Sequence, residues 1–297
     1  MAVTAASGAR VAAPARTVSA AGPQRRRRGR AGLVVRIVLA AIVGIVMVFP
    51  FWVMVVTAFS GQSVFTGQVD LWPDRLSLDN FTRVFRAWPV PLWFGNSVTV
   101  SLITTFLTVV ISVLAGFAFA KLRFPGRNVL FLVLLSTMMI PTQAILVSQF
   151  RIVDNLGLLG TFWAVIIPGA AATFGIFLAR QFMLAIPNEL IEAARIDGAG
   201  TGRIFWSVVL PLSKPLLAVL TLLSLMYQWN DFLWPLIVLK DPTLYTLPIG
   251  LQFLKGQYTT DYGALMAMTL ISVAPLVILF LAFQRFFVQG LATTGLK

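Results

Sequence analysis

The sequence predicts an all-α polytopic membrane protein with six transmembrane helices and a short cytoplasmic helix between the fourth and the fifth. Three observations predict this fold class. First, 58% of the 297 residues are hydrophobic and only 11% are charged, whereas a soluble domain has about 25% charged residues. Second, the apolar residues form blocks long enough to cross a bilayer. Third, the lysines and arginines collect on one side of these blocks.

Residues 1–30 predict a disordered, basic, cytoplasmic tail. The net charge of the chain is +13, and seven of the basic residues lie in this tail. Its composition of Ala, Ser, Pro, Gly and Arg is typical of disorder, and the absence of any aromatic residue argues against nucleic-acid binding. The apolar run that follows is too long for a signal peptide and no small-residue cleavage site closes it. We therefore expect an uncleaved first membrane anchor, which is the first span of a six-span transmembrane domain at 31–297.

Five apolar blocks are each long enough for one membrane-spanning helix. They are the predicted first, second, third, fourth and sixth spans: 37–59, 97–120, 129–150, 158–179 and 263–287. The last three contain Pro141, Pro168 and Pro275, respectively, and a proline removes one helical hydrogen bond. Each of these prolines either kinks a packed helix or provides a flexible point for transport.

The fifth span lies in an apolar stretch of 36 residues, 204–239. Pro211, Pro215 and the polar triplet Trp229-Asn230-Asp231 interrupt it. Two spans and a turn need about 40 residues or more, so one span followed by a half-inserted segment fits better. Non-helical backbone at that depth must be buried in protein or line a wet cavity. The total is six spans, and both termini are expected on the same side.

The basic residues indicate which side is cytoplasmic. Of the 23 lysines and arginines, 17 fall on the side of the N-terminus and six on the other. Because positive charge is concentrated in cytoplasmic loops, both termini are expected in the cytoplasm. The loop with Lys121, Arg123 and Arg127 is then cytoplasmic, as is the segment 180–214, whereas the longest external loop is 60–96.

A polar segment between the fourth and fifth spans, NELIEAARIDGAG at 188–200, predicts a short helix. Asn188 is a suitable N-cap, Glu189 and Glu192 lie near the positive helix end, and Gly198 suits the left-handed residue that ends a helix. A helix of about ten residues is too short to span a bilayer or to be stable alone in water. It therefore needs a partner surface, which is either a second protein or the lipid surface.

The motif EAARIDGA, with Phe205, Leu210-Pro211 and Pro215 after it, resembles the EAA loop of inner-membrane permease subunits of bacterial ABC importers. The stretch 157–199 is similar to the carbohydrate-uptake branch of this family, which includes the smaller permease of the maltose system. The segments WNDFLWPLIVL, YTLPIGL and QRFFVQGLATTGLK are similar to the same branch. The resemblance covers about residues 35–297, and the EAA motif is its most specific part.

The resemblance implies a permease in a bacterial inner membrane that forms half of a sugar or oligosaccharide pathway. It also implies three partners: a second, non-identical permease, a dimeric cytoplasmic ABC ATPase and an extracellular or periplasmic sugar-binding protein. ATP and Mg²⁺ would bind to the ATPase, so this chain would need no cofactor. The short helix would be the coupling helix, docked in a groove of the ATPase through Glu192, Ala193, Ala194, Asp197, Gly198 and Ala199.

The residues themselves argue against an enzyme. The chain has no histidine or cysteine, which excludes most zinc sites, thiolate chemistry and histidine acid–base catalysis. It has no Gly-Lys dipeptide and therefore no phosphate-binding loop, and it lacks the metalloprotease and esterase motifs. We expect no catalytic residue and no metal site, and any ATP hydrolysis must occur in another chain.

The polar triplet Trp229, Asn230 and Asp231 is the strongest candidate for a substrate pathway. An ionisable group near membrane depth is a functional candidate, and an aromatic face with amide groups suits a sugar. The alternative is that Asp231 lies at the outer interface and organises the bend before Pro235. Gln143 is a weaker candidate, as is Asn96, and either could simply satisfy a hydrogen bond between helices.

Two other functions remain open on the residues alone. A secondary transporter or channel for a small polar solute would need a self-sufficient pathway, usually with intramembrane charges. A membrane-embedded enzyme would need acid–base groups. The predicted spans have almost none of either, so the importer permease is favoured, and the sequence does not name its sugar.

Overall fold

A computed structural model describes residues 24–61, 72, 75–255 and 261–294 of the chain. The described residues are helical almost throughout, and the only β-type pairing found among them is an isolated bridge between Ser60 and Leu76. The chain divides into two compact units, Met1–Phe51 and Trp52–Lys297, and each is described by itself.

The first unit consists of the N-terminal part of helix α1 (Gln24–Phe59). From residue 32 to residue 51 every side chain is exposed. The segment Gly32–Phe59 has a mean hydropathy of 2.7, and a helix that is apolar on all sides belongs in lipid or in a core. The predicted first span is therefore a long apolar helix.

The start of α1 corrects part of the predicted tail. We expected disorder through residue 30, but the helix begins at Gln24 and includes the run QRRRRGR. Arginine is a good helix former, and extending an existing helix costs less than starting one, so the apolar helix continues upstream into the basic run. The rest of the predicted tail, 1–23, lies outside the described residues.

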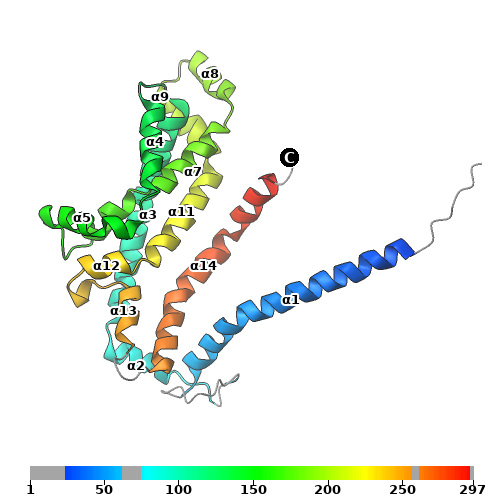
Figure 1. The fold of residues 1–297 in the computed structure, drawn as a ribbon, viewed down its shortest axis with the longest axis vertical. Coiled ribbons are helices and arrows are strands. Elements are labelled where there is room, and N and C mark those ends of the chain that lie inside the picture. Colours follow the sequence, from blue (N-terminus) through cyan, green and yellow to red (C-terminus); the bar gives the residue numbers. More distant parts are fainter. Residues whose placement is uncertain (1–23, 62–71, 73–74, 256–260, 295–297) are drawn as a thin grey trace, which may run out of the picture. The chain divides into compact units, whose positions relative to one another are not determined.

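The second unit is built around the long helix α3 (Figure 1), which makes its most extensive contacts with α7, α11 and α6. The elements of this unit, in chain order, are α2 (Asp79–Ala87), α3 (Val90–Lys121), α4 (Arg127–Thr137), α5 (Thr142–Asn155), α6 (Trp163–Ala170), α7 (Thr173–Leu184), α8 (Asn188–Ile196), α9 (Thr201–Ile204), the π-helix η1 (Phe205–Val209), α10 (Leu210–Leu212), α11 (Lys214–Trp229), α12 (Leu233–Val238), the 3₁₀ turn η2 (Pro242–Leu244), α13 (Leu247–Phe253) and α14 (Tyr262–Thr294).

Small polar residues form the buried face of α3. Such residues let helices approach closely inside a membrane. One of them, Thr108, donates through Oγ1 to the carbonyl oxygen of Gly169 at 3.4 Å, and Gln228 Nε2 of α11 donates to the same oxygen at 3.3 Å. Gly169 lies next to the break between α6 and α7, so these side chains satisfy backbone that a continuous helix would satisfy itself. The buried polar residues of α3 are Asn96, Ser97, Ser101, Thr104, Thr105, Thr108 and Ser112.

Two predicted spans are sharply bent. The predicted third span is broken into α4 and α5, whose axes differ by 102°, and Pro141 precedes the first residue of α5. In the fifth, Thr201–Leu212 and Lys214–Trp229 differ by 75°. Here Ser213 is buried at the bend, and its Oγ donates to the carbonyl oxygen of Val209 at 2.7 Å. By contrast, Pro275 does not interrupt α14.

By length and composition, four helices among the described residues can cross a membrane, or up to six if each bent pair is one span. The predicted number of six therefore requires both bent pairs to cross. Two further boundaries differ from the prediction. Helix α3 begins at Val90 rather than at 97, and the predicted external loop 60–96 contains α2.

Helix α2 is anchored by Asn80, which is fully buried. Its Nδ2 donates to the carbonyl oxygens of Thr57, Ala58 and Ser60 at 3.1, 3.1 and 2.7 Å. These carbonyls belong to the last turn of α1 and the residue after it, where helical donors are missing. A single side chain therefore caps the end of one helix from another.

Candidate functional site

Helix α8 lies at one end of the second unit, beyond α9 and far from α2 and α13 (Figure 1). Ile191 is its only buried residue. Ile191 belongs to an apolar cluster with Phe117 and Phe205, and Ala194 and Ala199 pack against this cluster while partly buried. The rest of the helix is open to solvent or to a partner.

The exposed side of α8 and the turn after it contain four of the six predicted docking residues. Glu192, Ala193, Asp197 and Gly198 are exposed. On the same short segment Ile196 is 86% exposed, and an apolar side chain of this size gains free energy only when another surface covers it. The six predicted residues are therefore brought together, four on the open face and two, Ala194 and Ala199, against the body of the protein.

The C-terminal end of α8 is a Schellman motif. The N–H of Ala199 donates to the carbonyl of Ala194 at 2.9 Å, and the N–H of Gly198 donates to that of Arg195 at 3.0 Å. Gly198 has a φ of +80°, in the left-handed region. The prediction that Gly198 ends this helix is confirmed.

The N-terminal end of α8 differs from the prediction. Pro187, not Asn188, is the residue before the helix, and Asn188 is its first residue. The Oδ1 of Asn188 accepts from Lys121 Nζ at 2.8 Å, and the same ammonium group donates to the carbonyl of Ile186 at 2.7 Å. Lys121 is the last residue of α3, so the side chain of Asn188 holds a tertiary contact in place of an N-cap.

Lys121 is a residue of this site that sequence reasoning missed. It was considered only as a charge that sets membrane orientation. Its partners lie 65 and 67 positions later in the chain, and no local pattern joins them. Lys121 therefore joins the end of α3 to the start of α8, while Ile191 packs the middle of α8 against the apolar cluster.

The predicted pathway residues fall into two groups. Trp229 is 5% exposed, its indole Nε1 donates to the Ser272 carbonyl of α14 at 3.0 Å, and its ring meets Phe94 edge-on at 5.8 Å. Trp229 therefore packs α11 against α3 and α14. The indole is held inside the protein because its N–H finds a backbone acceptor there.

The other candidates are more open. Asn230 is exposed, and its Nδ2 donates to the Met226 carbonyl at 2.7 Å. Asp231 is half-buried in the link between α11 and α12, next to the backbone N–H groups of Phe232 and Trp234. Gln143 is exposed at the start of α5.

Asn96 makes hydrogen bonds between α3 and the segment before α13. This agrees with the alternative interpretation, in which Asn96 satisfies a structural hydrogen bond and does not line a pathway. Its Nδ2 donates to the carbonyls of Thr243 and Tyr245 at 2.8 and 2.9 Å. It is 7% exposed, so it joins α3 to the turn before α13.

Comparison with known proteins identifies the family to which this chain belongs. Residues 108–293 match the family model described as "Binding-protein-dependent transport system inner membrane component". The chain is 39% identical over 261 residues to the arabinooligosaccharides transport system permease protein AraQ of Halalkalibacterium halodurans, covering 86% of this chain and 94% of the relative. It is 35% identical over 245 residues to the lactose transport system permease protein LacG of Rhizobium radiobacter, covering 82% and 89%.

Two more similarities extend over nearly the whole chain. The sn-glycerol-3-phosphate transport system permease protein UgpE of Yersinia pestis is 33% identical over 272 residues, with 88% of this chain and 97% of the relative covered. A solved chain of a bacterial ABC transporter involved in the import of the acidic polysaccharide alginate has the same fold, with a TM-score of 0.79 at 24% identity over 88% of this chain and 98% of that one. This chain therefore belongs to the family of binding-protein-dependent transport system inner membrane components and is a membrane permease subunit.

Proposed function

We propose that this permease subunit forms half of the pathway for a sugar or oligosaccharide and is driven through α8 by a separate ABC ATPase. The observation that supports the coupling role is the geometry of α8. It is a short helix fixed at both ends by Lys121 and by the turn at Gly198, and the exposed residues of this segment include the acidic Glu189, Glu192 and Asp197.

The cargo class follows from the relatives. Their names specify arabinooligosaccharides, lactose and sn-glycerol-3-phosphate, and these molecules share closely spaced hydroxyl groups. Membership in the permease family also separates this chain from the alternative of a secondary transporter or channel. A carbohydrate is therefore the cargo we infer, without a choice among sugars.

The coupling would work through contacts that differ between two states. A groove on the ATPase would accept the exposed side of α8, where Ala193 and Gly198 allow close approach and the carboxylates of Glu192 and Asp197 meet basic or amide groups. ATP and Mg²⁺ would bind between the two ATPase subunits. A partner moves a helix only when its contacts with the two states have different free energies, so closure of the ATPase must change the fit around α8.

The same proposal includes three further features. A second, non-identical permease would complete the pathway, and an extracellular or periplasmic sugar-binding protein would deliver the cargo. Both termini would be cytoplasmic, in a bacterial inner membrane. Asn230, Asp231 and Gln143 are the residues we propose for the pathway, and Trp229 would support the first two by fixing the end of α11 against α14.

The docking role can be tested with a pair of identical substitutions. Ala193→Arg puts a long charged side chain on the exposed face of α8, while Ala87→Arg does the same at the exposed last residue of α2. We expect Ala193→Arg to lose most of the ATPase that co-purifies with the tagged chain in mild detergent, because an alanine in a close contact leaves no room for arginine. Ala87→Arg should retain it.

Both variants must remain in the membrane fraction at the wild-type level, since each changed residue is exposed. If Ala193→Arg keeps its ATPase and its sugar uptake, α8 is not the docking element. If the wild-type chain brings down no ATPase at all, the importer assignment itself fails.

A further inference from the structure

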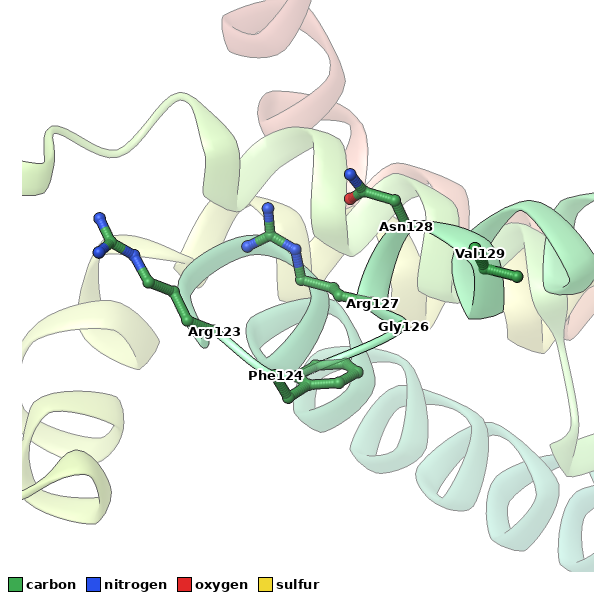
Figure 2. A pocket seen from close by; sticks show the side chains of 6 residues that line it. All are labelled: Arg123, Phe124, Gly126, Arg127, Asn128 and Val129. Atoms are coloured by element: carbon green, nitrogen blue, oxygen red, sulfur yellow. The ribbon is translucent and has the colours of Figure 1, made fainter.

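A basic pocket lies at the turn between α3 and α4. Its volume is about 470 Å³. Figure 2 shows the polar ends of Arg123, Arg127 and Asn128 reaching to one side of the turn, while the ring of Phe124 lies on the other. Gly126 makes the turn with a φ of +77°. The pocket is lined by Arg123, Phe124, Gly126, Arg127, Asn128 and Val129.

The positive charge of this pocket is not neutralised within the part of the chain that the structure describes. Among the described residues the ion pair is between Arg83 and Asp261. Neither of these residues lines the pocket. Arg127 donates through Nη1 to the Leu122 carbonyl at 2.9 Å, and Arg123 is exposed. A third cation, Arg180, lies near Arg127, with its guanidinium 4.1 Å from the centre of the Phe131 ring. The pocket therefore has two arginines, Arg123 and Arg127, with Arg180 close to the second of them, and positive charges gathered in this way favour an anionic ligand.

The position of the pocket suggests what the anion is attached to. Helix α3 has 32 residues and is one of the candidate spans, so the turn after Lys121 lies where a membrane ends. Helix α4 leaves the pocket with apolar side chains on its open face. Val129, Leu130, Leu132 and Val133 are all more than half exposed. A cationic pocket is therefore followed by an apolar strip that runs into the membrane.

We propose that this pocket binds the phosphate of an anionic phospholipid, with the acyl chains lying along the exposed face of α4. Guanidinium groups bind phosphate oxygens through two parallel hydrogen bonds, and basic pockets next to membrane helices bind anionic headgroups. An acidic surface of a cytoplasmic partner would explain the arginines but not the apolar strip, and the membrane surface of a second permease would explain the strip but not the arginines. A phospholipid matches both parts.

The test uses the full-length chain, purified in mild detergent and examined by native mass spectrometry. Phosphatidylglycerol and phosphatidylcholine with the same acyl chains are added in turn. The test variant is Arg123→Gln/Arg127→Gln. The matched control is Arg75→Gln/Arg86→Gln, which removes the same charge from two exposed residues at the other end of α3.

We expect the wild-type chain and the control to retain phosphatidylglycerol in preference to phosphatidylcholine. Each arginine removed from the pocket should weaken retention of phosphatidylglycerol about fivefold. Because Arg127 also holds the turn, Arg123→Gln alone is measured as well. Arg123 makes no hydrogen bond or ion pair within the described residues, so its loss should leave the fold intact.

Three results would overturn the proposal. The first is equal retention of the two lipids by the wild-type chain. The second is displacement of phosphatidylglycerol by millimolar inorganic phosphate, which would indicate a site for a free anion. The third is a double variant that keeps its phosphatidylglycerol but loses co-purifying ATPase, which would make the pocket a protein contact. Because lipid retention is measured on the isolated chain, it does not depend on the coupling role of α8.

Discussion

At the scale of single residues, Gly198 and Gly200 lie two positions apart between α8 and α9 and differ in one property. A side-chain carbon at either position would meet no atom within 4 Å. Gly198 has a φ of +80°, whereas Gly200 has a φ of −71°. The difference between them is therefore the backbone conformation and not the available space.

Substituting each of these glycines by alanine tests whether the left-handed turn is required. Gly198→Ala should disfavour the left-handed conformation by about 1–2 kcal/mol, because the added carbon clashes with the alanine's own backbone. We expect ATPase binding and sugar uptake to fall at least about fivefold, which is the equilibrium factor for 1 kcal/mol. The measurement is ATPase binding to the purified chain over a concentration series.

Gly200→Ala is the control, since its φ suits any residue, and it should behave like the wild-type protein. Equal losses in both variants would mean that the loop tolerates no side chain at all. A wild-type result for Gly198→Ala would show that the left-handed turn is unnecessary for docking.

At the scale of elements, the packing of α3 against α7 depends on small residues. A side-chain carbon on Gly175 of α7 would overlap Ser112 Oγ and lie 3.2 Å from Ser112 Cβ. Gly116 of α3 faces Ala179 of α7 in a similarly close way. The two helices can approach this closely only because neither face carries bulk.

Gly175→Ala should therefore destabilise the protein although alanine is the better helix former. We expect a loss of about 1–3 kcal/mol from overpacking, seen as a lower midpoint of thermal unfolding in detergent. Gly95→Ala is the matched control, because it lies in α3 with no atom within 4 Å of the added carbon. It should be neutral or stabilising by up to about 1 kcal/mol.

A second substitution tests whether the contact with Ser112 causes the loss of stability. Ser112→Gly should recover most of the loss in the Gly175→Ala background, because it removes the two atoms that crowd the new methyl group and leaves only Leu220 Cδ2, at an ordinary contact distance of 3.7 Å. If Gly175→Ala is as stable as Gly95→Ala, or if Ser112→Gly rescues nothing, the close contact between α3 and α7 does not control stability.

At the scale of the whole molecule, the orientation in the membrane is open to a direct test. The chain has no cysteine, so a single introduced thiol can be labelled without background. Arg203→Cys lies at an exposed position in α9, close to the end of α8, and Arg86→Cys lies at an exposed position in α2. The bias of basic residues predicts that these positions face opposite sides of the membrane.

A membrane-impermeant maleimide should label Arg86→Cys in spheroplasts. It should label Arg203→Cys only after the membrane is opened. Labelling of Arg203→Cys from outside would place α8 away from any cytoplasmic ATPase, and the coupling proposal would then be abandoned.

The sequence by itself determined the fold class, the family and the position of the short polar helix between the fourth and fifth predicted spans. Bilayer thickness sets the length of an apolar block, and a continuous helix satisfies its own backbone groups in lipid, so apolar blocks such as 97–120 can be recognised without their neighbours. The turn at Gly198 was predictable for the same reason, since its two hydrogen bonds lie within a few residues. The EAA motif is also local, and family comparison confirmed the assignment that it suggested.

Only the tertiary structure decided where helices break and which polar residues are used for packing. Pro141 precedes a bend of 102°, whereas Pro275 leaves α14 continuous, because neighbouring elements determine whether a missing hydrogen bond becomes a bend. Trp229 was predicted for the pathway but finds its acceptor in Ser272, 43 positions away. Lys121 donates a hydrogen bond to Asn188, which lies 67 positions later in the chain. Such partners meet only when the helices have packed. The role of Lys121 in holding the start of α8 could therefore not be identified from the sequence.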